Sequence, residues 1–286
     1  MKFHHPDARL FVPDGTPEAD ALARTTHLGI GAHQDDLEFM ALHGILACHQ
    51  RADRWFGGVT ATNGAGSARA GAYADCTDGD MRALRREEQE NAARIGQYGF
   101  MAQLDYPSSE VKTPEGSRLV DELAALLDAT RPEVVYTHNP ADKHETHIGV
   151  TAAVLKAIRS LPRERRPDRL LGCEVWRGLD WMADEEKVVL DVGGHENLAA
   201  ALNGVFDSQI AGGKRYDLAV LGRRRANATF FDSHSVDDVD QAWFAMDLTP
   251  LVQREEADIT GYVQDAIDRF AEDVRTKLTR HFPRSG

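Results

Sequence analysis

Residues 27 to 38 read His27-Leu28-Gly29-Ile30-Gly31-Ala32-His33-Gln34-Asp35-Asp36-Leu37-Glu38. They open with a short apolar run, which indicates a buried strand, and continue with one imidazole and three carboxylates. A strand that leads through a polar turn into a helix is the building unit of open α/β folds, which bind ligands beyond the carboxyl ends of their strands. This segment therefore predicts an α/β fold and places reactive side chains where such folds bind ligands.

A second polar cluster has the same position relative to a strand. It reads Asp142-Lys143-His144-Glu145-Thr146-His147 and follows the apolar segment 133–137. Taken alone, each cluster has a simple structural explanation: an aspartate at a helix start can cap free amides, and the second cluster has the composition of a solvated loop. Because both clusters follow a strand and enter a helix, we expect them to assemble into one site.

Three of these side chains match the ligand set of a catalytic zinc ion, which has about three nitrogen or oxygen ligands from the protein and one position for water. His33 and Asp36 are three residues apart, so a turn that becomes helical brings them to one side, and His147 comes from the second strand end. Asp35 faces elsewhere and is free to act as a base. The spacing of His144 and His147 differs from that of the H-E-x-x-H motif, which excludes a helical zinc protease.

The two clusters together resemble the motifs of the PIG-L/LmbE-like zinc-dependent de-N-acetylases. The first motif of that family reads A-H-P-D-D-x-E, and residues 32–38 match it except that Gln34 replaces the proline. Its second motif, often H-P-D-H, corresponds to residues 144–147, in which Thr146 replaces the aspartate. The strong resemblance covers about residues 27 to 160. Weaker matches occur at residues 59–64, 85–93, 189–192 and 208–209.

This resemblance implies specific roles for the residues of both clusters. His33, Asp36 and His147 would bind Zn2+, with Fe2+ and Co2+ as alternative metals, and Asp35 would be the general base. Zinc lowers the pKa of a bound water to about 7, and a carboxylate within hydrogen-bond reach can take up the remaining proton. His144 would stabilise the oxyanion or protonate the leaving amine.

The sequence gives weaker evidence for the residues that support the metal ligands and for those that bind substrate than for the ligands themselves. Thr146 replaces the aspartate that usually orients the first histidine of the second motif, and Asp142 is the candidate substitute. Arg177, at the end of a later apolar run, and Arg85 are the candidate substrate-binding residues. Glu38 could support a metal ligand or be an exposed carboxylate near a helix start.

Strand and helix patterns alternate along the chain, which predicts a Rossmann-like, mostly parallel sheet with helices on both faces. The expected strands are residues 27–32, 54–61, 100–105, 133–138, 170–176 and 187–192. The expected helices are residues 37–50, 81–97, 117–130, 146–160 and 195–209. Residues 62–80, rich in small side chains, form a long loop that could cover the site or be disordered.

A single domain is expected over residues 1–286, with a core of about residues 22–210 and a C-terminal extension of about residues 211–286. The extension should contain two strands and a long amphipathic helix. The apolar positions of this helix recur at helical spacing, so its face could bury against the sheet or form a subunit contact in a homo-oligomer. These three elements are residues 228–232, 242–248 and 252–278.

The charge, the cysteine content and the apolar runs of the chain indicate which binding partners and which cellular location to expect. The chain has 286 residues, with 33 Lys and Arg against 46 Asp and Glu, and a net charge of −13. This negative charge disfavours nucleic acids and anionic membrane surfaces. Three scattered cysteines without C-x-x-C spacing indicate a reducing compartment. No apolar run has the length expected of a signal peptide or a membrane span, so a cytoplasmic location is expected.

The predicted function is hydrolysis of the N-acetyl group of an amino sugar or glycoconjugate. Two alternatives remain, a zinc amidase that acts on a larger amide or a thiol conjugate and a non-catalytic sugar-binding protein that keeps the fold. A dinucleotide-binding domain is excluded, because the fingerprint G-x-G-x-x-G starting at Gly29 would need glycine in place of Gln34. His138 matches no motif position and is not included in the site.

Overall fold

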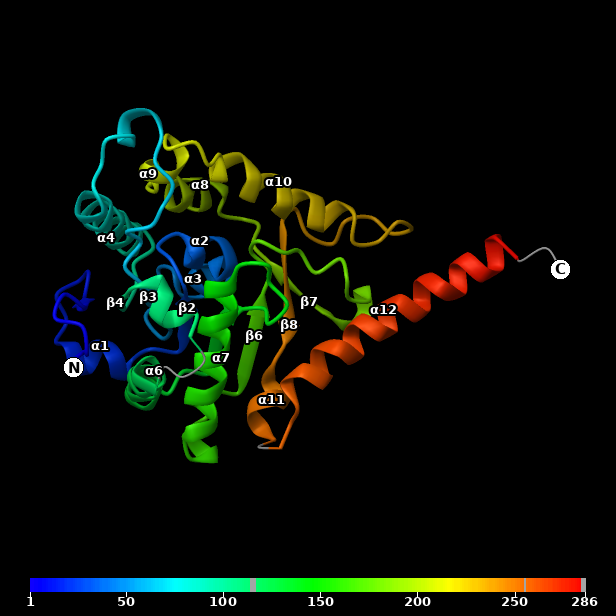
Figure 1. Cartoon of the computed structure of the whole chain (residues 1–286), viewed down its shortest axis with the longest axis horizontal. Coiled ribbons are helices and arrows are strands. Elements are labelled where there is room, and N and C mark those ends of the chain that lie inside the picture. Colours follow the sequence, from blue (N-terminus) through cyan, green and yellow to red (C-terminus); the bar gives the residue numbers. More distant parts are fainter. Residues whose placement is uncertain (114–116, 255, 284–286) are drawn as a thin grey trace.

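The computed structural model describes residues 1–113, 117–254 and 256–283 (Figure 1). Its central feature is an eight-stranded sheet with the strand order β1-β4-β3-β2-β5-β6-β8-β7. Strands β2 to β6 run parallel to one another, which confirms the predicted mostly parallel α/β fold. The strands are β1 (Arg9–Phe11), β2 (His27–Gly31), β3 (Phe56–Thr62), β4 (Phe100–Tyr106), β5 (Val134–His138), β6 (Arg169–Cys173), β7 (Lys187–Asp191) and β8 (Ala242–Asp247).

Antiparallel strands lie toward the two edges of this sheet. The short strand β1 pairs with β4, and β8 lies between β6 and β7 and is antiparallel to both. No sequence pattern predicted β1. Strand β8 belongs to the predicted C-terminal extension, so the extension contributes a strand to the same sheet as the core.

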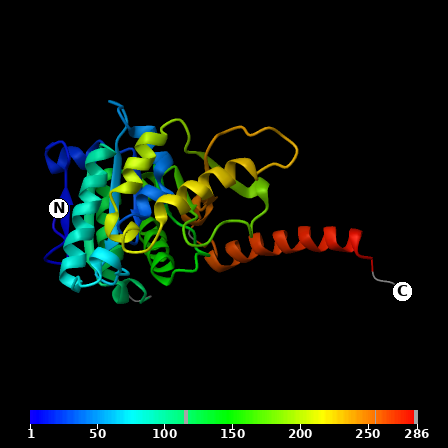
Figure 2. The same cartoon turned by 90° about the horizontal axis from the view of Figure 1, so that it is seen from above.

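Helices cover both faces of the sheet (Figures 1 and 2). They are α1 (Glu18–Ala23), α2 (Asp36–Met40), α3 (Leu42–Cys48), α4 (Asp78–Ile95), α5 (Ser108–Val111), α6 (Ser117–Thr130), α7 (Glu145–Ser160), α8 (Glu196–Gly204), α9 (Asp207–Ile210), α10 (Tyr216–Thr229), α11 (Thr249–Gln253) and α12 (Ile259–His281). Apolar side chains of α1, α6, α7 and α11 pack in one buried layer, and those of α2, α3, α4 and α8 pack in a second. The sheet lies between the two layers, as in other doubly wound folds.

Strand β2 has glycine where α2 approaches it most closely. A Cβ atom at Gly29 would lie 2.8 Å from Phe56 Cζ and 3.0 Å from Leu37 Cδ2. The opposite face of β2 carries Leu28 and Ile30, which are fully buried in the first layer. Gly29 therefore serves close packing of helix on sheet, in agreement with the exclusion of a dinucleotide fingerprint.

The predicted strand at residues 228–232 is wrong. Helix α10 continues to Thr229, and Ala228 is buried against the core. The β-branched and aromatic residues from Thr229 to Phe231 suggested a strand, but the packing of α10 overrides their local preference. Of the two strands predicted for the extension, only β8 forms within the described residues.

Two predicted helices are each divided in two. The helix predicted at residues 37–50 is interrupted at Ala41, whose φ of −107° and ψ of 14° are not helical. The helix predicted at residues 195–209 is divided between α8 and α9, because Phe206 has a φ of −84° and a ψ of 53°. Both interruptions lie within apolar helical patterns, so periodicity alone did not reveal them.

The long C-terminal helix is confirmed, with different bounds. The segment predicted as one helix, residues 252–278, contains the end of α11 and most of α12. Helix α12 projects from the body of the molecule (Figures 1 and 2). Among the described residues, no helix combines the length and the apolar character needed to cross a membrane.

The direction in which the sheet is built reverses between β2 and β5. From β2 the chain adds β3 and β4 on one side, and it then adds β5 and β6 on the other side. Such a reversal leaves a crevice at the carboxyl ends of the two central strands, where open α/β folds bind ligands. The two polar clusters follow β2 and β5, so the fold brings both of them to this crevice.

Helix α7, which carries the second cluster, packs closely on α5 through Gly149. A Cβ atom at Gly149 would lie 2.3 Å from the carbonyl oxygen of Val111. We predict that Gly149→Ala lowers the free energy of unfolding by about 1–3 kcal/mol, because the backbone must shift. In contrast, Gly222→Ala in α10, where nothing lies within 4 Å, should raise it by up to about 1 kcal/mol. Equal effects in chemical denaturation would contradict this packing.

Candidate active site

The first cluster forms a tight turn between β2 and α2. Asp35 has a φ of 96°, a backbone conformation that residues other than glycine rarely adopt. Helix α4 holds this turn: Gln89 Oε1 accepts the N–H of Asp35 at 3.2 Å, and Arg85 donates a hydrogen bond to the carbonyl oxygen of Gln34. Strained residues persist where the surrounding structure fixes them, and buried contacts with α4 do so here.

Buried polar side chains on both sides of the turn add to this support. Gln34 Nε2 donates to the carbonyl oxygen of Thr62 at 3.0 Å. Glu38 Oε1 accepts hydrogen bonds from Gln89 Nε2 at 2.8 Å and from the Tyr98 hydroxyl at 2.7 Å. Burial raises the pKa of Glu38 to about 8. Glu38 is neither exposed nor hydrogen-bonded to a predicted ligand, so it supports the turn through Gln89 instead of filling either role considered from the sequence.

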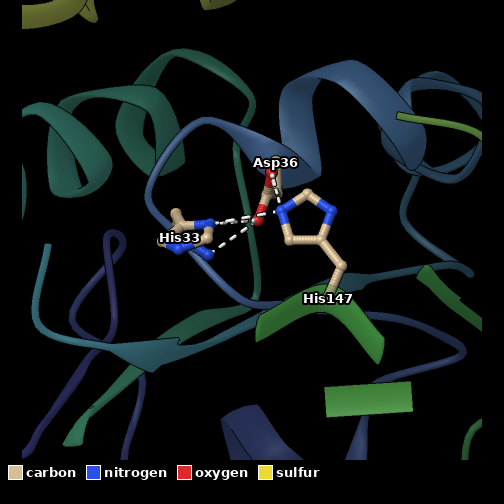
Figure 3. Close-up of side chains that lie close together, drawn as sticks. All are labelled: His33, Asp36 and His147. Atoms are coloured by element: carbon tan, nitrogen blue, oxygen red, sulfur yellow. Dashed lines mark hydrogen bonds and ion pairs between the residues drawn. The ribbon is translucent and has the colours of Figure 1, made fainter. Parts of the chain in front are cut away.

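The predicted ligands His33, Asp36 and His147 converge at the crevice (Figure 3). His33 Nδ1 lies 3.3 Å from Asp36 Oδ2 and 3.2 Å from His147 Nε2, and His147 Nε2 lies 3.5 Å from Asp36 Oδ1. Ligand atoms about 2.0–2.1 Å from a tetrahedral zinc ion are about 3.3–3.4 Å apart. The three side chains therefore fit around one such ion with little movement.

Asp36 gives the site a buried negative charge. Its Oδ2 accepts the backbone N–H groups of Ala32 at 3.1 Å and His33 at 2.7 Å. Burial opposes ionisation, but the nearby imidazoles, led by that of His147, hold the pKa of Asp36 well below its usual range. Burial also opposes protonation of His147, yet nearby carboxylates, chiefly Asp36, raise its pKa. Both shifts reflect the close approach of Asp36 and His147.

Asp142 lies behind His147, one of the predicted ligands. Its Oδ2 lies 3.3 Å from His147 Nδ1, the nitrogen that faces away from the other two ligands. Asp142 also accepts the backbone N–H groups of His144 at 3.1 Å and Trp176 at 3.2 Å. The prediction that Asp142 orients the ring of His144 is therefore wrong, because its side chain reaches only the backbone of that residue. A carboxylate behind a histidine ligand fixes the tautomer and the ring orientation.

Asp35 lies beside the ligands and faces a different partner. Its Oδ2 accepts a hydrogen bond from Arg85 Nη1 at 3.1 Å, and both side chains are buried. Burial raises the pKa of Asp35 to about 7, and Arg85 opposes this rise. The neighbouring carboxylates Asp35 and Asp36 thus have pKa values shifted in opposite directions. Such a divergence is typical of sites where one group holds charge and the other exchanges protons.

His144 occupies the N-cap position of α7 without a capping hydrogen bond from its side chain, and its ring lies over the two predicted histidine ligands. Its ring stacks on His147 with centroids 4.6 Å apart and meets the edge of His33 at 4.9 Å. Burial and, to a smaller extent, the neighbouring imidazoles of His33 and His147 together lower the pKa of His144 to about 4. Its Nδ1 is buried and has no hydrogen-bond partner within the described residues. The loss of the usual aspartate at Thr146 thus leaves His144 without a carboxylate to hold it.

His138, which sequence reasoning left out, belongs to the site. It is fully buried and stacks on His147 with ring centroids 3.7 Å apart. Its Nε2 accepts the N–H of Ala32 at 2.9 Å and lies 3.4 Å from Asp36 Oδ2. The available signal was its position as the last residue of β5. His138, Asp142 and His147 form a second group that could hold a metal, but all three are buried, whereas a catalytic ion needs an open position.

A cavity of about 610 Å³ opens in front of the predicted ligands. Asp35, Asp36 and His144 form part of its wall, and residues between Gly64 and Ala68, in the long loop noted above, form another part. The loop is therefore placed to contact a bound molecule. Aromatic and cationic side chains complete the wall: Phe39, Trp176, Tyr216, Trp243, Lys112, Lys214 and Arg223.

The two arginines predicted to bind substrate have different positions. Arg85 lines the cavity, but it is only 2% exposed and is held by Asp35 and Gln34. Arg177 is exposed, and the described residues that line the cavity do not include it. A cation does reach this region, since Lys214 Nζ lies 5.3 Å from the ring centroid of Trp176. A substrate contact of Arg177 stays a prediction.

The sequence of residues 28–158 matches the family model described as PIG-L, GlcNAc-PI de-N-acetylase. The predicted resemblance is confirmed. Residues 28–158 are a PIG-L domain. This segment contains both polar clusters, the turn between β2 and α2, and helix α4. No curated protein matches the sequence of the chain.

Solved structures share the fold of this chain at low sequence identity. N,N'-diacetylchitobiose deacetylase from Pyrococcus horikoshii is 15% identical, with a TM-score of 0.57 over 81% of this chain and 87% of that chain. The 4-carboxy-2-hydroxymuconate hydratase GalB from Pseudomonas putida KT2440 is 18% identical, with a TM-score of 0.56 over 78% and 96%. Teicoplanin deacetylase Orf2, in a zinc-inhibited form, is 14% identical, with a TM-score of 0.54 over 78% and 98%. Similarity at this level shows a common fold.

The contact between Asp142 and His147 yields a test in the PIG-L domain. We predict that Asp142→Ala weakens zinc binding about 10- to 100-fold, because His147 loses the partner that fixes its ring. Competition with a chromophoric chelator measures this affinity. Lys143→Ala, at an exposed neighbouring position, is the control and should bind zinc like the unchanged protein. Equal affinity of the two variants would show that Asp142 does not orient the ligand.

Proposed function

We propose that this protein is a metal-dependent deacetylase that hydrolyses the N-acetyl group of an amino sugar or glycoconjugate. The observation that carries the proposal is the arrangement in a PIG-L domain of three ligand side chains beside a separate carboxylate. The ring nitrogens and carboxylate oxygens of His33, Asp36 and His147 that would bind the metal lie 3.2–3.5 Å apart. Asp35 lines the adjoining cavity. Metal-assisted hydrolysis of an amide needs a cation site, a base and space for the acyl group, and these side chains and the cavity would supply each of them.

The donor set suits a divalent metal ion of the zinc type. Two imidazole nitrogens and one carboxylate oxygen would hold Zn2+, with Fe2+ and Co2+ as alternatives. When bound, such an ion would acidify a water molecule and polarise the acyl oxygen of the substrate. Excess zinc is expected to inhibit the enzyme, because one protein of the same fold was solved in a zinc-inhibited form. The metal must therefore be identified by titration.

Asp35 is proposed as the general base. Its carboxylate faces the cavity next to Asp36 and is positioned by Arg85. A carboxylate in this place can accept a proton from water during attack on the acyl carbon and later pass it to the amine. The strained backbone of Asp35 keeps it from joining the ligand set, since the φ of 96° separates its direction from that of Asp36.

His144 is proposed to stabilise the oxyanion. Its ring lies over the two histidine ligands and lines the cavity. The sequence left open whether His144 stabilises the oxyanion or protonates the leaving amine. No carboxylate among the described residues hydrogen-bonds its ring, which favours a neutral imidazole that donates a hydrogen bond.

The cavity wall indicates which part of a substrate is recognised. Trp176, with its ring centroid 6.2 Å from that of His144, can pack against one face of a sugar ring next to the acyl group. Lys214 Nζ lies over the ring of Trp176, and Arg223 and Lys112 also line the cavity. These cations favour a substrate with an anionic substituent next to the sugar. Arg177, outside this wall, would contact only a larger substrate.

Two other functions are kept as alternatives. The cavity of about 610 Å³ has room for more than one sugar, so an amidase that acts on a larger amide or a thiol conjugate also fits. A non-catalytic sugar-binding protein would need no base, and the buried Arg85–Asp35 contact beside the ligands favours catalysis instead. The fold alone does not choose between reactions, because the hydratase GalB shares it.

The decisive experiment is acetate release from a panel of N-acetylglucosamine derivatives with neutral and anionic aglycones. The metal-free protein is reconstituted with graded zinc, iron(II) or cobalt(II), and each reaction is repeated with a chelator. Acetate release that requires metal supports the proposal, and a preference for anionic aglycones supports the role of the cationic wall. Release of a larger acyl or thiol fragment would favour the amidase. Sugar binding without turnover under every metal would favour the binding protein.

We predict that Asp35→Asn keeps the metal but lowers kcat at least 100-fold, because an amide cannot accept the proton. Metal content is measured by plasma emission spectrometry and turnover by acetate release. His147→Ala is the matched comparison and should lose the metal itself, since it removes a ligand. Unchanged turnover in Asp35→Asn would rule out its role as base.

A second variant tests whether Arg85 positions Asp35 or binds substrate. Its guanidinium donates to Asp35 and to the carbonyl oxygen of Gln34, so we predict that Arg85→Met lowers kcat 10-fold or more with little change in KM. Steady-state kinetics on the best substrate of the panel measures both constants. A large rise in KM with kcat unchanged would show instead that Arg85 mainly binds substrate, as expected from the sequence.

A further inference from the structure

Helix α12 has little support from the rest of the molecule along most of its length. It runs from Ile259 to His281 and projects from the body (Figures 1 and 2). Ala266 is its only buried residue, and every residue from 272 to 281 is exposed. Short helical segments without tertiary packing are marginal in water. We therefore expect the projecting half of α12 to be stabilised by contact with another molecule.

The exposed half of α12 carries an apolar stripe. Val274, Leu278 and Phe282 follow one another at intervals of four and are 37%, 52% and 74% exposed. Phe270 continues the stripe toward the body of the molecule. Residues at this spacing share one side of a helix, so the stripe is a continuous apolar surface. Large apolar side chains gathered on one side of an exposed helix indicate an interaction site.

A groove lies where this stripe meets the body of the molecule. It has a volume of about 570 Å³ and lies between α12 and the segment 180–187. Its large apolar side chains are Met182, Phe270, Val274 and Leu278. Its charged lining has five acidic side chains, Asp180, Asp184, Glu185, Glu186 and Asp273, against three basic ones, Lys187, Arg269 and Lys277. The three basic side chains pair with Asp184, Glu186 and Asp273, so Asp180 and Glu185 leave the groove with an excess of negative charge. An apolar groove with an acidic rim fits a segment that is itself apolar and basic.

The end of α12 has that combination of side chains. Residues 273–281 contain three basic side chains, Arg275, Lys277 and Arg280, against one acidic side chain, Asp273. The preceding residues 259–272 contain three acidic side chains, Asp265, Asp268 and Glu272, against one basic side chain, Arg269. The helix is thus acidic near the body and basic near its end. Within the described residues Arg280 forms no ion pair.

We propose that a second copy of this chain occupies the groove, with the two α12 helices antiparallel. A two-fold axis would place the basic end of each helix, with Leu278 and Phe282, against the acidic groove of the other. Each copy then contributes the same surface to the contact, and the basic end of one α12 pairs with the acidic groove of the other copy on both sides of the axis. A parallel arrangement would place like charges together, which costs energy. The contact lies outside the residues that line the proposed active site.

The oligomeric state of the full-length protein tests this proposal. Sedimentation velocity over a 100-fold range of concentration should show a species of twice the 31.6 kDa chain mass that dissociates on dilution. The double variant Leu278→Glu, Phe282→Glu should remain at the monomer mass. Thr276→Glu, at an exposed position on the opposite side of α12, is the matched control and should still dimerise. Circular dichroism and a thermal melt confirm that each variant is folded.

Charge reversal tests the direction of pairing. Arg280→Glu should weaken the dimer at least tenfold, and combining it with Glu185→Arg should restore most of the affinity, because the proposed antiparallel arrangement would bring these two positions together. A wild-type protein that stays monomeric at the highest concentration would overturn the proposal. A dimer that persists in the Leu278→Glu, Phe282→Glu variant would also overturn it. Loss without rescue in the charge pair would overturn the antiparallel arrangement.

Discussion

The site depends on one buried carboxylate, that of Asp36. Its charge is held by two backbone N–H groups of its own turn and by imidazoles that arrive from β5 and α7. Removing a carboxylate from water is costly unless hydrogen bonds and opposite charge replace the lost hydration. The reversal of strand order between β2 and β5 supplies that replacement, because it places the two polar clusters at the same crevice. The geometry of the predicted ligands therefore depends directly on the topology of the sheet.

The same turn must present two adjacent carboxylates in different directions. Asp36 faces the histidines, whereas Asp35 faces Arg85, and the difference requires the unusual backbone of Asp35. Helix α4 provides the compensation through Arg85 and Gln89, and Gln89 is in turn held by Glu38. In related motifs a proline occupies position 34, which would stiffen this turn directly. Here the side chain of Gln34 binds the end of β3 instead, so the turn is fixed by packing and hydrogen bonds.

The sequence predicted the convergence of the candidate ligands and the fold, because both follow from local pattern. His33, Asp36 and His147 have distinctive spacing next to apolar strands, and the alternation of strand and helix requires a mostly parallel sheet. The features that escaped prediction depend on tertiary packing. His138 is recognisable as a site residue only once β5 lies next to β2, and Asp142 could be assigned to His147 only when the direction of its side chain was known. The strand expected at residues 228–232 failed because long-range packing of α10 outweighs local preference.

The reactive groups and most of the cavity wall come from different parts of the chain, which explains why the substrate is harder to infer than the chemistry. The groups assigned to metal binding and proton transfer all lie within residues 28–158, the part that matches the family model. Most of the aromatic and cationic wall of the cavity comes from later residues, including Trp176, Lys214, Tyr216 and Trp243. Trp243 is on β8, the strand that the C-terminal extension inserts between β6 and β7, and α11 and α12 follow directly. The segment that shapes the cavity is therefore continuous with the segment that carries the proposed dimer contact, so both specificity and self-association could change along this region while the catalytic turn is left intact.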